Sequence, residues 1–165
     1  MEVTFIITNL ISNMESQKID FSIYKDEFEA TTSDKTYLLS KTKSSEIWDK
    51  FIDNEAKSYF QLNNQNWIIK SKNTVLGKWL EDFNKGDRES VKNVLDKKLY
   101  WENEDVVYYC ISKYLIIESS WYEFKELWMS FLACEDDCPI LINKMKPDLA
   151  LIFNSLGDII YIENR

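Results

Sequence analysis

The sequence predicts an α+β fold, in which helices cover one face of a mainly antiparallel sheet. Two observations carry this prediction. The C-terminal half has the order ββαβββ, because β-branched and aromatic runs stand on both sides of one helical segment. More helical periodicity lies earlier in the chain, and grouped strands together with grouped helices favour an antiparallel sheet over a parallel one.

The first 40 residues contain three short β-favouring runs, at 3–7, 21–24 and 36–39, which polar segments separate. The apolar period then changes to three and four residues, and this pattern predicts a helix over about 45–59. A serine pair at 44–45 precedes it, and serine hydroxyls can accept hydrogen bonds from the N–H groups of a first turn.

Two further helices are predicted before residue 100. The apolar face of the first consists of Val75, Leu76, Trp79, Leu80 and Phe83. Gly86 ends it, because glycine adopts the left-handed conformation that often terminates a helix. Asp87 then caps the second helix. The inward residues of that helix are Val91, Val94, Leu95 and Leu99.

The C-terminal half begins with a predicted hairpin from residues 106–111 and 115–117. Ser120 and Glu123 have the spacing of a capping box, so a helix is expected to follow them. Its apolar stripe consists of Trp121, Phe124, Leu127, Trp128, Phe131 and Leu132. The remaining strands are predicted at 139–142, 149–153 and 159–162. A turn with Gly157 at positive φ joins the last two.

The chain has 165 residues, of which 45% are hydrophobic, and we expect a single domain over 1–165. Its apolar runs are far shorter than the roughly 18 residues that cross a bilayer. Residues 1–5 lack the basic start of a signal peptide. Cys110, Cys134 and Cys138 are odd in number and too few for a disulfide framework. We therefore expect a cytoplasmic protein.

The absence of histidine from the sequence excludes Ser-His-Asp and Cys-His catalysis, and it excludes zinc sites that rely on imidazole. The three glycines lie apart in the sequence, so they form no phosphate-binding loop. A net charge of −8, with lysines dispersed among acids, repels nucleic acid and anionic membranes. We expect no cofactor, metal ion, nucleic acid or membrane as a partner, and we assign no catalytic residue.

The negative charge is unevenly distributed along the chain. Residues 1–100 contain 16 acidic and 15 basic side chains, whereas residues 101–165 contain 12 and five. Such a field attracts cationic partners over a long range. The densest acidic stretch, 135–137, lies between Cys134 and Cys138. Its carboxylates could hold Mg²⁺ or Ca²⁺. The two thiols could hold a soft metal or form a redox pair, but the ligands are too few for a closed zinc site. An acidic contact patch is the preferred interpretation.

Among single carboxylates, Glu118 has the most apolar sequence neighbours, but a structural role near the start of a helix is the preferred interpretation. Most aromatic residues stand at helical or strand spacing and are expected in the core. The aromatic residues left over as candidate interface anchors are Trp101, Tyr109, Tyr114 and Tyr122.

Three motifs occur in order in the C-terminal part of the chain. They are Asp105-Val106-Val107-Tyr108-x-Cys110, Glu118-x-x-Trp121-x-x-Phe124-x-x-x-Trp128-x-x-Phe131-Leu132 and Asp136-Asp137-x-Pro139-Ile140-Leu141-Ile142. Through these motifs, residues 100–165 resemble a bacterial family known only as domain of unknown function 2947. This resemblance implies a small single domain, and it transfers no activity or site residue. The chain has Cys138 where the family is expected to have a glycine before the proline.

In overall character, the chain is similar to bacterial immunity proteins, which are small, acidic and cytoplasmic and neutralise toxins. Many such toxins are basic nucleases, and a carboxylate patch can occupy the surface that would hold phosphate. The leading hypothesis is a non-enzymatic protein that masks the active or substrate-binding surface of a basic toxin domain. Its expected contact residues are Trp101, Glu102, Glu104, Asp105, Tyr109, Glu135, Asp136 and Asp137.

Two alternative classes stay open at this point. One is a small enzyme that uses Glu118 and the carboxylates at 135–137, directly or through a divalent metal. The other is a structural protein that self-associates through exposed aromatic residues. The sequence predicts neither the identity of the partner nor the oligomeric state.

Overall fold

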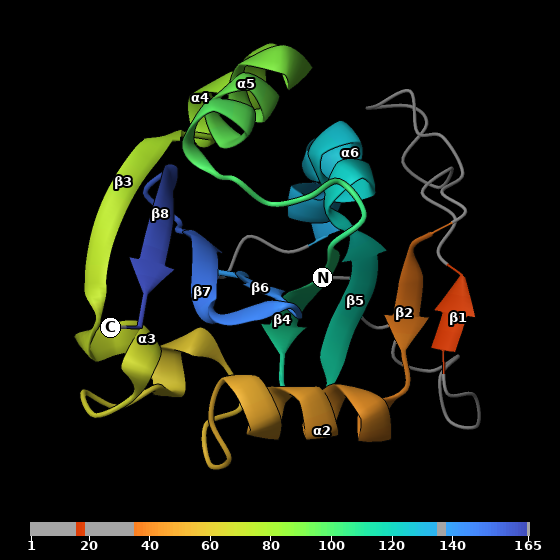
Figure 1. Cartoon of the computed structure of the whole chain (residues 1–165), viewed down its shortest axis with the longest axis vertical. Helices are drawn as coiled ribbons and strands as arrows, with labels where there is room; N and C mark the ends of the chain where they lie inside the picture. The colour runs from red at the N-terminus through yellow and green to blue at the C-terminus, as the bar shows by residue number, and fades with distance from the viewer. Residues whose placement is uncertain (1–15, 19–34, 135–137, 165) are drawn as a thin grey trace.

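The computed structural model describes residues 16–18, 35–134 and 138–164. The strands of these residues form one antiparallel sheet in the order β1-β2-β5-β4-β6-β7-β8-β3 (Figure 1). They are β1 (Ser16–Lys18), β2 (Tyr37–Leu39), β3 (Lys72–Lys78), β4 (Val106–Ser112), β5 (Leu115–Ser120), β6 (Ile140–Asn143), β7 (Lys146–Phe153) and β8 (Asp158–Glu163). The helices are α2 (Lys41–Phe51), the 3₁₀ helix η2 (Tyr59–Gln61), α3 (Trp67–Lys70), α4 (Leu80–Lys85), α5 (Arg88–Lys98) and α6 (Trp121–Cys134).

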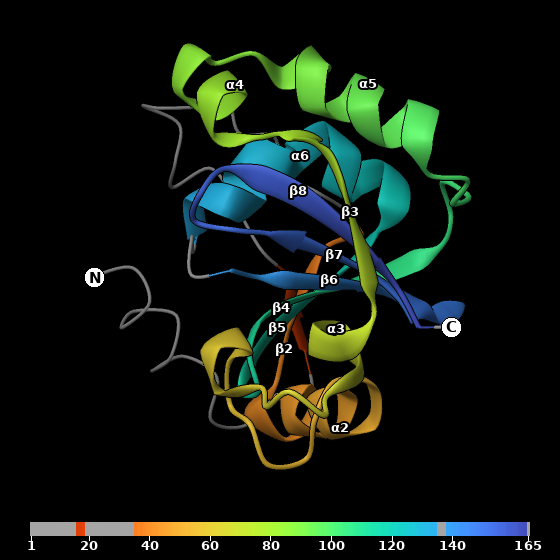
Figure 2. The same cartoon turned by 90° about the vertical axis from the view of Figure 1, so that its left-hand side faces the viewer.

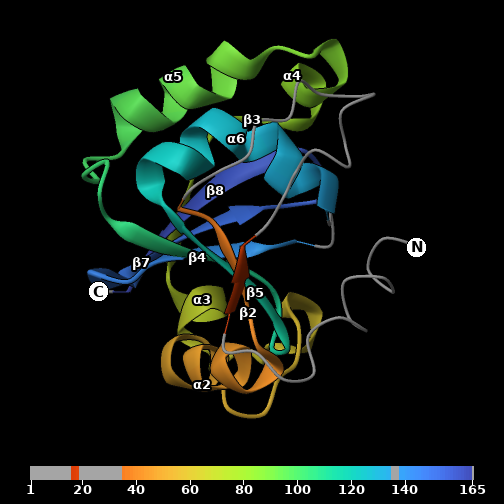
Figure 3. The same ribbon diagram turned by 90° about the vertical axis from the view of Figure 1, so that its right-hand side faces the viewer.

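The α+β class is confirmed, but helices cover both faces of the sheet and not one. Helices α4, α5 and α6 lie on one face, and α2 and α3 lie on the other (Figure 2). The view from the β1 edge shows the same two layers (Figure 3). Two-sided coverage explains the apolar runs of the central strands, since all four residues of β6 are buried. A strand that is buried on both faces has a continuous apolar run and no alternation.

Each face of the sheet has its own hydrophobic core. The core under α4, α5 and α6 holds most of the large aromatic side chains, and its fully buried members include Trp121, Phe124, Trp128 and Phe131. The indole N–H of Trp128 donates to the carbonyl oxygen of Arg88 at 2.9 Å and so joins α6 to α5. The core under α2 and α3 is mainly aliphatic and includes Trp48, Ile68, Ile116, Ile140 and Ile142.

The N-terminal predictions are confirmed in part. Strand β2 corresponds to the run at 36–39, whereas the runs at 3–7 and 21–24 lie outside the described residues. The helix expected over 45–59 is α2, which starts earlier because the hydroxyl of Ser40 accepts a hydrogen bond from the Lys43 N–H at 3.2 Å.

The expected cap at 44–45 is therefore wrong, and Ser44 is buried inside α2. Helix α2 also ends earlier than expected. The carboxylate of Asp53 accepts the N–H groups of Glu55 and Ala56, both at 2.8 Å, and this bonding forms a turn that cannot continue the helix.

The prediction of a helix that begins at Val75 and Leu76 is wrong for its first half. Both residues belong to β3, an edge strand whose ladder partner is β8, with a register shift between Val75 and Gly77. The second half of the expected helix is α4. It ends at Gly86, whose φ is 70°, as predicted. The carboxylate of Asp87 caps α5, also as predicted.

The predicted order of the C-terminal half, ββαβββ, is confirmed. Strands β4 and β5 form the hairpin, and β6, β7 and β8 follow α6 as consecutive antiparallel neighbours. The Ser120 hydroxyl accepts the Glu123 N–H at 3.2 Å, which is the expected cap of α6. Gly157 has a φ of 86° in the turn between β7 and β8.

Candidate functional site

A hollow of about 430 Å³ lies beside the segment that joins α5 to β4. We call residues 100–105 of this segment the acidic loop. In Figure 1 the segment passes from α5 in front of α6 to reach β4. The hollow is lined by Asp96, Leu99, Tyr100, Trp101, Glu102, Asn103, Glu104 and Lys125. Three of these side chains are carboxylates and one is an ammonium group.

The acidic loop is held by hydrogen bonds to the start of α6. The carbonyl oxygen of Asp105 accepts the Trp121 N–H at 2.8 Å, and that of Asn103 accepts the Tyr122 N–H at 3.0 Å. These N–H groups have no partner inside the helix, so the loop satisfies them. The Asp105 carboxylate accepts the Glu102 N–H at 3.2 Å and the Asn143 side-chain amide at 2.8 Å. Asp105 therefore shapes the loop and is not free to contact a partner, which corrects its expected role.

Lys125 lies at the base of the hollow and is buried. Its ammonium group donates to the Asp96 carboxylate and, at 3.1 Å, to the side-chain oxygen of Asn103. It also lies 5.4 Å from the centre of the Trp121 ring. The single positive charge of the hollow is therefore used inside the protein, and the accessible charge is that of the carboxylates.

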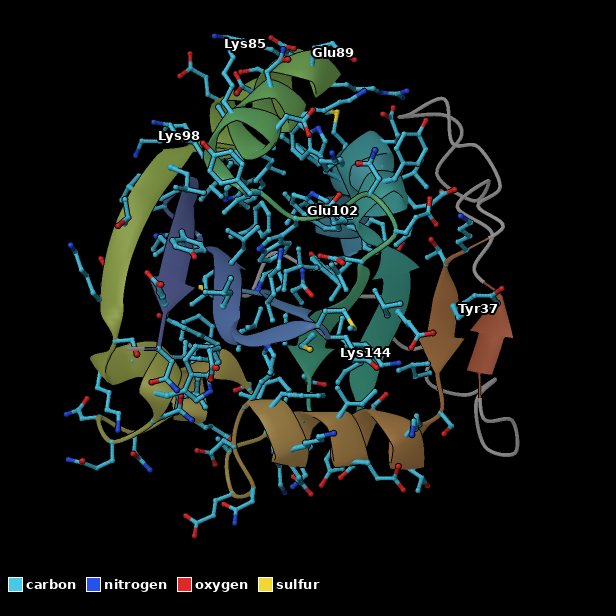
Figure 4. All side chains as sticks on the ribbon, viewed as in Figure 1. Tyr37, Lys85, Glu89, Lys98, Glu102 and Lys144 are labelled. Atoms are coloured by element: carbon cyan, nitrogen blue, oxygen red, sulfur yellow. The ribbon has the colours of Figure 1, made fainter. Side chains whose placement is uncertain are left out.

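Glu102 and Glu104 are exposed on the acidic loop, and Figure 4 shows Glu102 on the segment between α5 and β4. The Glu104 carboxylate accepts a hydrogen bond from Lys35 at 2.9 Å, and this bond raises the pKa of Lys35. Both of these side chains are more than half exposed, and exposed ion pairs of this kind are weak. Within the described ranges, Glu102 forms no ion pair of its own. Both carboxylates can therefore receive an external cation.

Two aromatic residues that were expected to be interface anchors are buried. Tyr109 is 0% exposed and packs against the rings of Phe124 and Phe131, because β4 is covered on both faces. Trp101 is 7% exposed, and its ring lies 4.8 Å from that of Trp121. Both expected roles as exposed anchors are wrong.

Other side chains supply the exposed apolar surface around the acidic loop. Tyr100 is 87% exposed, and Tyr122 is 48% exposed beside Asn103. Met145 is also exposed, one residue before Lys146, whose ammonium group donates to the Tyr100 carbonyl oxygen at 2.9 Å. Tyr100 and Met145 were not expected from the sequence. The lysines on both sides of Met145 were the available signal for its exposure, whereas Tyr100 lies between Leu99 and Trp101, which give no such signal.

The charge imbalance along the chain is partly cancelled in three dimensions. Lysines that precede residue 100 pair with carboxylates that follow it, namely Lys35 with Glu104, Lys78 with Asp158 and Lys92 with Glu126. Two lysines of the C-terminal part pair in the opposite direction, Lys113 with Asp49 and Lys125 with Asp96. The field at the acidic loop is therefore local, and it depends chiefly on the carboxylates at the hollow.

Of the carboxylates of the enzyme hypothesis, the structure describes only Glu118. Glu118 lies on β5, where its carboxylate is hydrogen-bonded to Tyr108. Residues 135–137 lie outside the described residues. Among the residues that are described, no group of three or more Cys, Asp or Glu side chains is arranged to hold a metal ion. Cys110 and Cys138 are both buried, and burial raises the pKa of the Cys110 thiol.

The fold and the hollow together define a small antiparallel α+β protein with helices on both faces and an acidic loop at its surface. The chain belongs to the family described as protein of unknown function (DUF2947), whose model matches residues 12–160. This match extends the resemblance from the C-terminal part to most of the chain. No curated protein matches the chain, and no solved structure does. None of the helices within the described ranges has the length and apolar character to cross a membrane.

Proposed function

We propose that this protein is a non-enzymatic binding protein that holds a basic protein partner against the acidic loop. One observation carries the proposal: among the described residues that line the hollow, the ammonium group of Lys125 is bonded to Asp96 and Asn103, which leaves the exposed carboxylates of Glu102 and Glu104 for a partner. A partner with the opposite charge would be attracted before contact, which raises the rate of association and selects against anionic competitors.

Within this class, the function that we propose is that of a bacterial, cytoplasmic immunity protein. Its partner would be a basic, nuclease-type toxin domain. Glu102 and Glu104 would occupy the surface on which the toxin holds phosphate, and Tyr100 and Tyr122 would supply apolar contact area at the rim. The predicted contacts at 135–137 stay part of the proposal, since they lie outside the described residues.

Affinity capture from a lysate of the source cells tests the proposal, first at low salt and then with elution at high salt. The expected product is a basic protein whose toxic or nuclease activity the purified chain inhibits. An empty column, together with a divalent cation bound to the purified protein, would favour the enzyme hypothesis instead. A shift of mass with concentration in sedimentation would favour self-association.

Charge-reversal variants then locate the surface. Glu102→Lys combined with Glu104→Lys is expected to slow association and to reduce its dependence on ionic strength. A matched control is Glu46→Lys combined with Glu55→Lys, because both of these residues are exposed and Glu46 also pairs with a lysine, Lys43. Equal association rates for the two double variants would rule out the acidic loop as the contact surface. Reversal of the charges at 135–137 tests the second predicted patch separately.

A further inference from the structure

We propose that the outer edge of strand β3 binds an extended, acidic peptide segment of a partner protein as a further strand of the sheet. This surface is separate from the acidic loop, and the inference does not depend on the proposed function. Strand β3 ends the sheet, and β8 is its only ladder partner among the described strands. It is the outermost strand opposite β1 in Figure 1, and in Figure 2 it faces the viewer between α3 and α4.

The backbone of the first half of β3 has free hydrogen-bonding groups on its outer side. All four residues of this half, 72–75, are exposed, and we call them the open edge. Alternate residues of an antiparallel strand direct their N–H and C=O groups away from the partner strand. Outside the ladder with β8, the open edge forms no backbone hydrogen bond in the described structure. Its outward groups can therefore pair with an added strand.

The open edge is also the regular half of the strand. Its residues face residues 160–163 of β8 one to one, and the register shift follows only between Val75 and Gly77. An added strand needs this regularity, because its hydrogen bonds recur at every second residue. Val75 lies opposite Ile160, which packs against the core under α2 and α3, yet Val75 is 56% exposed. An apolar residue of the added strand beside Val75 would extend this face of the sheet.

The charges beside the open edge favour an acidic segment. Residues 70–78 include three lysines and no acidic residue. Lys78 is bonded to Asp158. Lys70 and Lys72 are exposed and, within the described part of the chain, form no ion pair. Carboxylates of an added strand can therefore pair with these two ammonium groups.

The same lysines disfavour a second copy of this chain as the added strand. When two β3 strands pair antiparallel over their full length, Lys72 of each copy lies opposite Lys78 of the other. Like charges in directly opposite positions are destabilising, and lysines on an edge strand protect it from self-association. An acidic strand avoids this repulsion. The net charge of −8 repels such a strand at a distance, but salt at about 0.15 M screens that repulsion beyond about 8 Å and leaves the contact pairs.

Titration of the ¹⁵N-labelled protein with synthetic peptides at about 0.15 M salt tests the open edge. The probe is the acetylated and amidated peptide Glu-Thr-Glu-Val-Thr-Val-Glu, which combines glutamates with β-favouring residues. We expect saturable shifts of the amide signals of residues 72–75. The same peptide with glutamine in place of glutamate should bind about tenfold more weakly. The acidic peptide with every backbone nitrogen methylated keeps its charges but has no backbone donors, and it should give no saturable shift.

Charge-reversal variants locate the binding surface. Lys70→Glu combined with Lys72→Glu should weaken binding of the acidic peptide at least about tenfold. The matched control is Lys41→Glu combined with Lys57→Glu, since both of these lysines are exposed and, among the described residues, form no ion pair. This control should bind like the wild type.

Three results of the titrations would overturn the inference: no saturable shift with the acidic peptide, an equal response to the methylated peptide, or an equal loss in the two double variants. Signals of residues 72–75 that move with protein concentration before any peptide is added would show that a second copy occupies the open edge. That result would overturn the inference as well.

Discussion

Raising the pH from about 8 to about 11 is expected to destabilise this protein through two buried acidic groups, Cys110 and Tyr108. Burial raises the pKa of the Cys110 thiol above its ordinary value of 9.0. Burial, and secondly the charge of Glu118, raise the pKa of Tyr108 from 10.0 to about 12. Both pKa values are higher in the folded than in the unfolded state, so the unfolded chain loses these protons first. Stability is therefore full below pH 9 and falls as the pH rises.

The size of the effect follows from the number of pH units in which only the unfolded state is ionised. Each such unit lowers the free energy of unfolding by about 1.4 kcal/mol. Cys110 contributes about two units between pH 9 and pH 11, and Tyr108 about one, so the combined loss is about 4 kcal/mol. This is a large part of the roughly 5–15 kcal/mol that stabilises a typical domain. Urea unfolding at each pH, followed by tryptophan fluorescence in the presence of a reductant, measures it.

Cys110→Ala and Tyr108→Phe separate the two contributions. Each substitution removes a titrating group and also lowers stability by an amount that does not depend on pH. From pH 8 to pH 11, the loss of stability should be smaller by about 2.7 kcal/mol in the cysteine variant and by about 1.4 kcal/mol in the tyrosine variant. The same dependence on pH in the wild type and in the double variant would refute the reasoning, because all other ionisable groups are common to both proteins.

Three further predictions concern positions where the backbone or a buried charge is constrained. Gly157→Ala should cost about 2–5 kcal/mol in urea unfolding, against about 1 kcal/mol for Gly86→Ala. Both glycines have positive φ, but only at Gly157 would a Cβ atom lie 2.7 Å from the Cβ of Leu80; similar losses would contradict this account. Cys138 has a φ of 56°, so Cys138→Val should cost about 2 kcal/mol or more, whereas Cys138→Gly should stay within about 1 kcal/mol of the wild type. A tolerated valine would show that the turn relaxes. Lys125→Met should lower stability by about 2 kcal/mol and shift the amide signals of residues 100–105, since it removes the bond to Asn103; unchanged signals would show that the loop holds its shape without Lys125.

The C-terminal half was predicted correctly because its signals are local. The hydroxyl of Ser120 caps α6 three residues away, and Gly157 forms its turn between adjacent strands. Strand β3 was not predicted, because its ladder partners in β8 lie 80 to 91 residues later in the sequence. The spacing of Trp79 and Phe83 does fit a helix, and their rings lie 6.0 Å apart at α4. The same periodicity extended by chance into Val75 and Leu76.

For the candidate site, the sequence predicted charge better than it predicted burial. Glu102 and Glu104 are exposed, as expected for glutamates in a short connection. Tyr109 was expected at the surface because a strand buried on both faces was not anticipated. The continuous run of residues 106–111 contains the signal for that burial. Trp101 and Tyr100 are adjacent, and only their packing against α6 decides which of the two is buried.

The strand order has a consequence for how the chain is made. Strand β2 pairs with β5, and β3 pairs with β8, so strands from the first half of the chain flank strands from the second half. During synthesis, Lys72–Lys78 has no ladder partner until Asp158–Glu163 has left the ribosome. The nascent chain must therefore carry an unpaired edge, with exposed backbone donors and acceptors, while residues 79–157 are synthesised. The sheet closes only after synthesis of the C-terminal hairpin, and folding should therefore be slow relative to a helical protein of this length.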